Sequence, residues 1–485
     1  MNITELNPTR VWKNFYSLTQ IPRPSKKEGK AVLFLEKFGK GLGLETIKDE
    51  LGNIIIRKPA TPGMENRRGI ILQAHIDMVP QKNSDNPHNF ETDPIIPRIV
   101  DEWVYATGTT LGADNGMGVA VAMAVLEAKD LVHGPVEILI TIDEETGMTG
   151  ARGLKAGLLS GDILINLDSE DEGELYVGCA GGMDATATFR YKNEAVPAGY
   201  VGMKLNITGM KGGHSGMDIV LGRGNANKTL VRILLPLIKE AKAKIASFEG
   251  GSLRNAIPRE AFATIAVPAK KVKIARRLVN KHYKEIVNEL AAQESNIKIT
   301  LEECKTPSKA IDASTALKAV LAIYACPNGV ERMSDAMEGL VETSNNLAIV
   351  KSGAGKIEVK CLMRSSVDSA KEMLASTLSS AFELAGAEVK LTGGYPGWKP
   401  NMDSAILTIM KSVYKKLYGK EPAVKAIHAG LECGILGGTY SNWDMISCGP
   451  TIKSPHSPDE RVNIKTVEKW WNYVVEILKT APVKK

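Results

Sequence analysis

Three short apolar runs in the first third of the chain each end in residues that can bind metal. Runs of this length, bounded by polar or turn-forming residues, predict buried strands. Because open α/β sheets place their ligand sites at the carboxyl ends of strands, we expect the residues that follow the runs to meet at one sheet edge. The runs and the residues that follow them are 69–74 (GIILQA) with His75, 136–142 (VEILITI) with 143–145, and 163–167 (ILINL) with Asp168.

Two further candidates lie outside the predicted strands. Asp114 stands in GADNG (112–116), just before a stretch of small residues, 117–126, that predicts a buried helix. His456 stands in PHSPDE (455–460), a turn-rich segment far downstream. Taken singly, such residues are more often satisfied polar groups, and Asp114 could simply cap the following helix.

The combination of these residues favours a metal site. With Glu145 they give the order His, Asp, Glu, Asp, His along the chain. Two imidazoles and three carboxylates suit a pair of zinc ions, about 3.5–4 Å apart, that share one carboxylate and hold a bridging hydroxide. The sequence therefore predicts a two-metal hydrolase.

The chemistry of such a site assigns further roles. Only a carboxylate has two oxygens with which to span both ions, and Asp114 is the candidate. Asp77, two residues after His75, is expected to accept the other N–H of the imidazole, which fixes its tautomer. Of the adjacent acids, Glu145 is expected to bind metal and Glu144 to act as the general base that passes a proton to the leaving amine.

The chain resembles the co-catalytic zinc peptidases, the family that includes carnosinases, aminoacylases and glutamate-releasing carboxypeptidases. Longer matches, which include residues 211–216 (KGGHSG) and 428–434, bring it nearest to the bacterial dipeptidases of that family. The resemblance implies hydrolysis of dipeptides with a free amino end, preferably Xaa-His and including β-alanyl-histidine. The motifs that carry the family resemblance are 74–80 (AHIDMVP), 112–116 (GADNG), 143–147 (DEETG), 166–169 (NLDS) and 449–456.

Carried over residue by residue, the resemblance implies a specific ligand arrangement. His75 and Asp168 are expected to hold one zinc ion, and Glu145 and His456 the other, with Asp114 between them. The resemblance agrees with the roles given above to the general base and to the partner of the imidazole.

The resemblance also implies residues that contact the substrate. His214 is expected to come from a lid domain and to steady the oxyanion of the tetrahedral intermediate, although the residues alone suggest only a turn histidine. Arg364 is a candidate clamp for the terminal carboxylate of the substrate. Glu432 is a candidate partner for the free ammonium group, and Asn255 is expected on the lid face.

The positions of the candidates divide the chain. Residues 1–184 and 398–485 are expected to form a discontinuous di-zinc catalytic domain of α/β class, with a mixed sheet flanked by helices. Residues 185–397 contain a repeated plan of paired strands, a helix and a further strand. This plan predicts an inserted α+β lid domain of two ferredoxin-like halves that closes over the metals.

Composition narrows the classes of partner. The net charge of +6 over 485 residues, without a basic block, indicates neither nucleic acid nor an anionic membrane. No apolar run approaches the roughly 18 residues that span a bilayer, and residues 1–20 lack the apolar core of a signal peptide. The six cysteines form no CxxC pair, which fits a reducing compartment and predicts a cytoplasmic location.

The expected cofactors are two zinc ions per subunit, for which cobalt or manganese can substitute at the same ligands. Small dipeptides are the expected partners, and the resemblance implies a homodimer. Two alternatives remain, an aminoacylase or tripeptidase of the same family and a protein that binds metal and peptide without catalysis. Residues 222–229 (GRGNANKT) share the frame of a phosphate-binding loop, but Asn227 replaces its second glycine and no strand leads into it.

Overall fold

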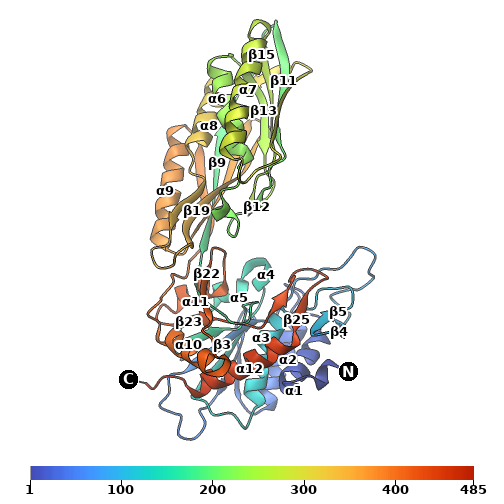
Figure 1. Cartoon of the computed structure of the whole chain (residues 1–485), viewed down its shortest axis with the longest axis vertical. Coiled ribbons are helices and arrows are strands. Elements are labelled where there is room, and N and C mark those ends of the chain that lie inside the picture. The colour runs from blue at the N-terminus through green and yellow to red at the C-terminus, as the bar shows by residue number, and fades with distance from the viewer. Residues whose placement is uncertain (1, 485) are drawn as a thin grey trace. The chain divides into compact units, whose positions relative to one another are not determined.

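The protein divides into two compact units in the computed structural model, which describes residues 2–484 (Figure 1). Unit 1 is formed by Met1–Gly178, Pro400–Ala426 and Leu431–Lys485, and unit 2 by Cys179–Lys399 and Ile427–Gly430. The boundaries expected from the sequence, residues 185 and 397, lie near the ends of the long segment of unit 2. The segment 427–430, which also belongs to unit 2, lies within the part of the chain that we expected to be catalytic.

Unit 1 is built on an eight-stranded mixed sheet with the strand order β1-β2-β6-β3-β7-β23-β8-β22. Strands β6, β3, β7 and β23 are consecutive neighbours that run parallel. Strands β3, β6 and β7 are buried along their whole length, as expected for parallel strands covered on both faces, and this is why their sequences are mostly apolar. The strands are β1 (Glu45–Lys48), β2 (Ile54–Lys58), β3 (Ile70–His75), β6 (Val136–Thr141), β7 (Ile163–Asn166), β8 (Glu174–Cys179), β22 (Ala423–Ile427) and β23 (Asp444–Ser447).

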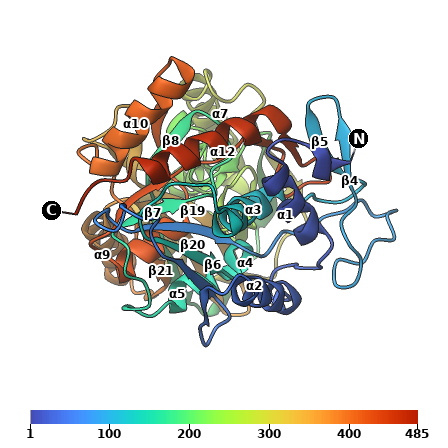
Figure 2. The same cartoon turned by 90° about the horizontal axis from the view of Figure 1, so that it is seen from below.

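Helices cover both faces of this sheet, with α3 and α12 on one side and α2 and α5 on the other (Figure 2). Every residue of α3 from Met117 to Leu126 is buried, which confirms the helix predicted from the small-residue stretch. The helices of unit 1 are α1 (Thr9–Thr19), α2 (Gly29–Gly41), α3 (Ala113–Glu127), α4 (Glu144–Gly147), α5 (Thr149–Gly153), α10 (Ala405–Tyr418), α11 (Glu432–Thr439) and α12 (Ile464–Lys479).

A second, four-stranded sheet of unit 1 has the order β24-β25-β5-β4. Its strands β24 and β25 pair antiparallel and enclose the loop that carries His456. The strands are β4 (Pro97–Val100), β5 (Trp103–Ala106), β24 (Ile452–Lys453) and β25 (Arg461–Asn463).

Unit 2 is built on a sheet with the order β16-β11-β15-β13-β19-β20-β9-β21, to which β18 adds by pairing with β19. Two ferredoxin-like halves make up this sheet, one running β11-α6-β13-β15-α7-β16 and the other β9-α8-β19-β20-α9-β21. The main strands are β9 (Gly181–Arg190), β11 (Tyr200–Thr208), β13 (Lys244–Gly250), β15 (Ala261–Pro268), β16 (Lys298–Cys304), β18 (Gly329–Met333), β19 (Val341–Gly353), β20 (Lys356–Ser365) and β21 (Glu388–Tyr395). The helices are α6 (Ala226–Lys239), α7 (Val272–Glu289), α8 (Ala313–Ala325) and α9 (Asp368–Leu384).

The two halves of unit 2 are nested. The first half lies between β9 and α8 of the second, so strand β9 pairs with β20 and β21 across the whole insertion. Residues 222–229 open helix α6 after a short 3-10 helix, and the Asn225 side chain caps that helix by accepting from the backbone N–H groups of Asn227 and Lys228. This segment therefore serves as a helix start.

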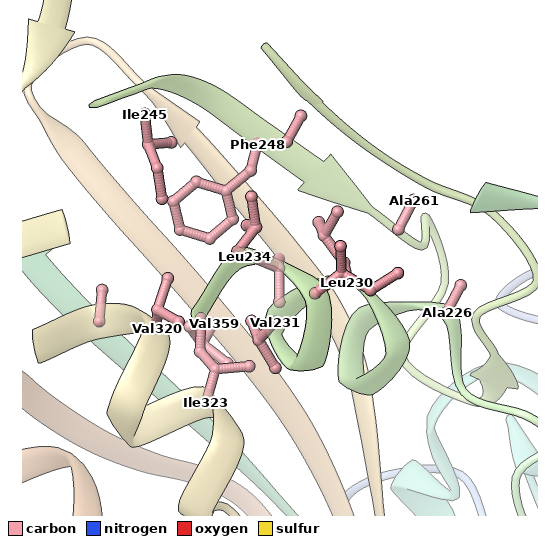
Figure 3. Close-up of a cluster of buried hydrophobic side chains, with 14 of the residues drawn as sticks. Ala226, Leu230, Val231, Leu234, Ile245, Phe248, Ala261, Val320, Ile323 and Val359 are labelled. Atoms are coloured by element: carbon pink, nitrogen blue, oxygen red, sulfur yellow. The ribbon is translucent and has the colours of Figure 1, made fainter. Parts of the chain in front are cut away.

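The core of unit 2 lies between its sheet and its helices (Figure 3). Leu230 and Leu234 of α6 meet Phe248 of β13, and Val320 and Ile323 of α8 belong to the same cluster. All five side chains are at most 1% exposed. Burial of side chains of this size contributes about 1.5–3 kcal/mol each, so unit 2 has the apolar core of a domain in its own right.

Within residues 2–484, the model contains no helix with both the length and the apolar character that a bilayer crossing requires. All six cysteines are thiols rather than halves of disulfides.

Candidate metal centre

Neighbouring parallel strands deliver three of the predicted ligands to one edge of the unit 1 sheet. His75 is the last residue of β3, Glu145 lies in the short helix that follows β6, and Asp168 is the second residue after β7. Because β6, β3 and β7 are adjacent and parallel, their carboxyl ends lie side by side. Asp114 enters from the start of α3, and His456 from the loop between β24 and β25.

The five side chains meet in a fixed pattern. One carboxylate oxygen of Asp114 lies 3.2 Å from Nε2 of His75, and the other lies 3.1 Å from Nε2 of His456. The Asp168 carboxylate lies 3.4 Å from the same nitrogen of His75, and the Glu145 carboxylate lies 3.0 Å from that of His456. Asp114 thus stands between two pairs, each of one imidazole and one carboxylate.

This donor set fits metal ions. Ligand atoms of His75, Asp114 and Glu145 all lie within 4.8 Å of one another. Glu145 Oε1 is buried and has no hydrogen-bond partner among the described residues. An oxygen of a buried carboxylate that lacks a donor is costly unless a cation compensates it. Imidazole nitrogen and carboxylate oxygen are ligands that zinc and related ions accept.

Proton affinities in the cluster reflect its crowded charge. The pKa of His456 rises to about 11, chiefly through its hydrogen bonds with Asp114 and Glu145. Burial raises the pKa of Asp168 to about 6, against the opposing effect of the nearby His75. Carboxylates outnumber histidines here, so the cluster attracts cations.

Asp77 organises the segments that carry its neighbours. One of its oxygens accepts the backbone N–H of Glu144 at 3.0 Å, and the other accepts that of Glu145 at 3.2 Å. Nδ1 of His75 lies 3.2 Å from the Asp77 carbonyl and 3.3 Å from its carboxylate. This arrangement places the imidazole proton on Nδ1, so that the lone pair of Nε2 can bind a metal ion.

Glu144 lies beside the cluster without belonging to the central pattern. Burial raises its pKa well above the ordinary value, the charges of Asp168 and Glu432 add to the effect, and His75 opposes it. A carboxylate with a raised pKa holds a proton more readily than an ordinary one, which suits proton transfer.

Glu432 is fully enclosed beneath the site, at 1% exposure. Its Oε2 accepts from Gln73 at 2.6 Å and from Thr141 at 2.8 Å, while Oε1 has no partner within the part of the chain described. Gln73 in turn accepts from Asn166, which links β3 to β7. Burial raises the pKa of Glu432 to about 7. The structure thus places this residue in a buried network that ties the ends of the strands together.

The remaining predicted site residues lie in unit 2. His214 belongs to the two-residue strand β12 (Gly213–His214), and its Nδ1 accepts the backbone N–H groups of Gly216 and Met217 at 3.2 and 3.1 Å. Its proton therefore resides on Nε2. Burial and the charge of Arg364 lower the pKa of His214, which keeps the ring neutral.

Arg364 is the second-last residue of β20. Its exposure is only 6%, so its side chain is buried and does not extend into solvent. Its Nε has no partner in residues 2–484, and burial lowers its pKa. Asn255 is exposed, and its carbonyl accepts the N–H of Ser215 at 2.9 Å, next to His214. His428 shares this region, because its charge interactions include both Arg364 and His214.

Sequence reasoning missed three residues that support the site. Asn115 donates to the carbonyl of Leu167 at 2.8 Å and to the Asp168 carboxylate. Arg23 and Glu460 are buried on either side of the segment that leads to Asp114. Glu460 stands four residues after His456 in a motif already singled out, whereas nothing local marks Arg23.

Comparison with known proteins agrees with this geometry. The model of the peptidase family M20/M25/M40 matches residues 71–480. The chain is 48% identical to the cytosol non-specific dipeptidase of Escherichia coli over 482 residues, which cover 99% of both proteins. It is 49% identical to the aminoacylhistidine dipeptidase of Vibrio alginolyticus, whose crystal structure superposes with a TM-score of 0.96 over 100% of this chain and 99% of that one.

A more distant structure, the aminopeptidase PepT of Bacillus cereus, shares 19% identity and a TM-score of 0.58 over 98% of each chain, which shows a common fold alone. Parallel strand ends that carry one imidazole and carboxylates, joined to an inserted α+β domain, define a hydrolase of metallopeptidase type. The chain belongs to peptidase family M20/M25/M40, and its fold is the catalytic domain with lid domain that the sequence predicted.

Proposed function

We propose that this peptidase is a metal-dependent dipeptidase that hydrolyses dipeptides with a free amino end and prefers histidine at the second position, β-alanyl-histidine included. The observation that carries the proposal is full-length likeness, at 48–49% identity, to two proteins whose names state dipeptidase activity. The geometry of unit 1 supports it, because Glu144 lies beside the predicted ligand Glu145 and a binding protein has no need of a general base.

Five residues would hold two metal ions. In this assignment Asp114 bridges, His75 and Asp168 complete one site, and Glu145 and His456 complete the other. Asp114 contacts both imidazoles, and each imidazole lies close to one further carboxylate, which supports this partition. Zinc is the proposed ion, with cobalt or manganese able to replace it. Ions held by these residues would supply Lewis acidity, which would polarise the substrate carbonyl and make water a stronger acid.

Glu144 takes the proton of the attacking water and then delivers it to the departing amine. Its raised pKa supports this role, because the same carboxylate must both accept and release a proton. Asp77 holds the backbone of Glu144 through the 3.0 Å hydrogen bond and so fixes the position of the base.

Residues outside the metal cluster recognise the substrate in this proposal. His214 donates its Nε2 proton to the developing oxyanion, which the tautomer fixed by Gly216 and Met217 supports. Arg364 binds the terminal carboxylate, with Asn255 beside the His214 segment. Glu432 interacts with the ammonium group of the substrate. Its Oε1, which has no hydrogen-bond partner among the described residues, supports a cation nearby. Because Glu432 is buried, it acts through the hydrogen-bond network at the strand ends.

A homodimer in the cytoplasm completes the proposal. The reduced state of all six cysteines supports a reducing compartment. Strand β21 is a sheet edge, and most of its residues are exposed, which leaves backbone groups available for pairing with a second copy. Light scattering coupled to gel filtration measures this directly, and a mass of one chain at all concentrations contradicts the dimer.

The test of the activity is a substrate panel on chelator-stripped protein before and after zinc is returned. The panel holds β-alanyl-histidine, glycyl-histidine, glycyl-leucine, a tripeptide and an N-acetylated dipeptide. We expect zinc-dependent cleavage of the free dipeptides, fastest for those that end in histidine, and none of the blocked one.

Two other outcomes point elsewhere. Preference for the tripeptide or the acetylated substrate replaces the proposal with a tripeptidase or an aminoacylase. Two bound metals without any cleavage indicate a binding protein.

A further inference from the structure

A buried carboxylate grips the segment that leads into Asp114. Glu460 is 2% exposed and accepts four consecutive backbone N–H groups. Its Oε2 binds those of Leu111 and Gly112 at 2.7 and 3.0 Å. Its Oε1 binds those of Ala113 and Asp114 at 2.7 and 3.2 Å. The backbone that carries the central carboxylate of the cluster is thereby held at the N–H group of Asp114 itself.

A buried guanidinium holds the same segment through its carbonyl. Arg23 is 1% exposed, and its Nη2 donates to the Gly112 carbonyl at 2.6 Å. Its Nη1 donates to the carbonyls of Ile76 and Asp77 at 2.7 and 3.3 Å. Arg23 therefore joins the loop that follows His75 to the segment that precedes Asp114.

The glycines of the GADNG motif make room for this guanidinium. A Cβ atom on Gly112 would lie 2.7 Å from Arg23 Nη2, and one on Gly116 would lie 2.5 Å from it. Gly112 also has a φ of +69°, which a residue with a side chain rarely adopts. The motif is thus shaped around Arg23 as well as around the ligand.

The charges of Arg23 and Glu460 are costly to bury. This cost argues that both residues are retained for the contacts that they make with the Asp114 segment. Burial lowers the pKa of Arg23 to about 10, and the charge of Glu460 makes the largest contribution against this effect. Each lies against segments that carry predicted ligands, because Glu460 follows His456 by four residues and Arg23 touches the loop after His75. Well-packed apolar residues would often give equal stability in place of such a pair.

We propose that Arg23 and Glu460 form a positioning clamp that presets Asp114 between His75 and His456, so that metal affinity depends on residues that touch no metal. The inference rests on the proposed metal-binding role of Asp114. It assigns no chemistry to the clamp, whose effect is to fix the distance between segments before an ion arrives.

The decisive variant is Arg23→Met. Loss of a positive charge near the cluster would by charge alone tighten the binding of a cation, whereas loss of the clamp weakens it. The measurement is the zinc content of chelator-stripped protein equilibrated over a series of buffered free zinc concentrations, together with the melting temperature of the metal-free protein.

We expect Arg23→Met to bind the more weakly held ion about 10–100-fold less tightly. Glu460→Gln should weaken it similarly, because an amide cannot accept four N–H groups. The matched control is Arg57→Met, which removes an arginine bound to a carbonyl and to Glu137 at the opposite end of β6. It should lower the melting temperature and leave zinc affinity unchanged.

Zinc binding by Arg23→Met as tight as in the wild type, or tighter, overturns the clamp. If that variant does not fold, Arg23→Lys decides in its place, since it keeps the charge and loses the two-pronged contact. Wild-type affinity in Arg23→Lys likewise overturns the proposal. Because zinc binding is measured without substrate, failure of the dipeptidase assignment shows only in the substrate panel and leaves this result readable.

Discussion

The two ends of strand β6 hold buried carboxylates in opposite circumstances. At its start, Glu137 accepts the N–H groups of Ser160 and Gly161 at 2.8 and 2.7 Å, and Arg57 donates to it at 3.0 Å. Past its other end, Glu145 lies 3.0 Å from His456 and has one oxygen without a donor. The charge of Glu137 is compensated by an arginine and by backbone N–H groups, as in a structural ion pair. Glu145 has an oxygen without any donor, which favours the binding of a cation.

The largest effect is expected for Asp114, which lies at the centre of the metal cluster past the carboxyl end of β6. Asp114→Ala removes the carboxylate that stands between both imidazoles, so both metal content and activity should fall to background. Metal analysis after dialysis, with a dipeptidase assay alongside, measures this. Asp162→Ala is the control, because Asp162 pairs with Arg68 at the start of strand β7, the end away from Asp168. Two metals per chain in Asp114→Ala would contradict the bridging role.

Substitution of Glu144 should affect turnover without affecting metal binding, because Glu144 is the proposed general base and not a proposed ligand. Glu144→Gln keeps the shape of the side chain and removes its ability to take a proton. We expect kcat to fall about 10²–10⁴-fold while both metals remain bound. Turnover at the wild-type rate with full metal content would show that another group is the base.

Substitution of Glu137, at the start of β6, should lower the stability of the protein and leave its activity nearly unchanged. Glu137→Gln weakens the contact with Arg57 and leaves a backbone donor poorly matched, at a cost of about 1–3 kcal/mol in the free energy of unfolding. Chemical denaturation of the metal-free protein measures this. The kcat/KM of the metal-loaded enzyme should stay within a factor of two or so of wild type. Loss of metal from this variant would abolish the distinction between the two ends.

The last prediction concerns His428, a buried base of unit 2 whose effect appears only on acidification. Burial lowers its pKa from the ordinary 6.5 to about 3. Below pH 6.5 the unfolded chain therefore binds a proton that the folded chain refuses, so stability is full above that pH and falls as pH drops towards 3. The slope is at most about 1.4 kcal/mol per pH unit.

Melting temperatures of metal-free wild type and of His428→Gln, followed from pH 7 to pH 4, test this sign. The variant should lose less stability on acidification than the wild type, whatever its offset at neutral pH. Parallel curves would show that His428 does not titrate differently in the folded and unfolded chains.

Much of unit 1 could be predicted because its central strands are buried on both faces. The run 69–74 is mostly apolar, and His75 at its end is visible against that background. The ends of helices are less visible in the sequence, because no side-chain cap marks the start of α2 at Gly29.

The supporting residues were beyond reach for a different reason. Arg23 acts on carbonyls of residues 76, 77 and 112, and Glu460 on N–H groups nearly 350 positions earlier in the chain. No local periodicity encodes such contacts. The nesting of unit 2 was missed likewise, since strand β9 and helix α8 belong to one half although residues 191–312 lie between them. The repeated plan in the sequence covered only the later part of each half.

The placement of His456 and Glu460 has a consequence during synthesis of the chain. Strand β23, the last member of the parallel set, begins only at Asp444, and both residues follow it. A nascent chain that has already produced His75, Asp114, Glu145 and Asp168 still lacks one imidazole and the carboxylate that holds the Asp114 segment. The ribosome must therefore deliver unit 2 and nearly all of unit 1 before all five predicted ligands and the carboxylate that holds the Asp114 segment are present together.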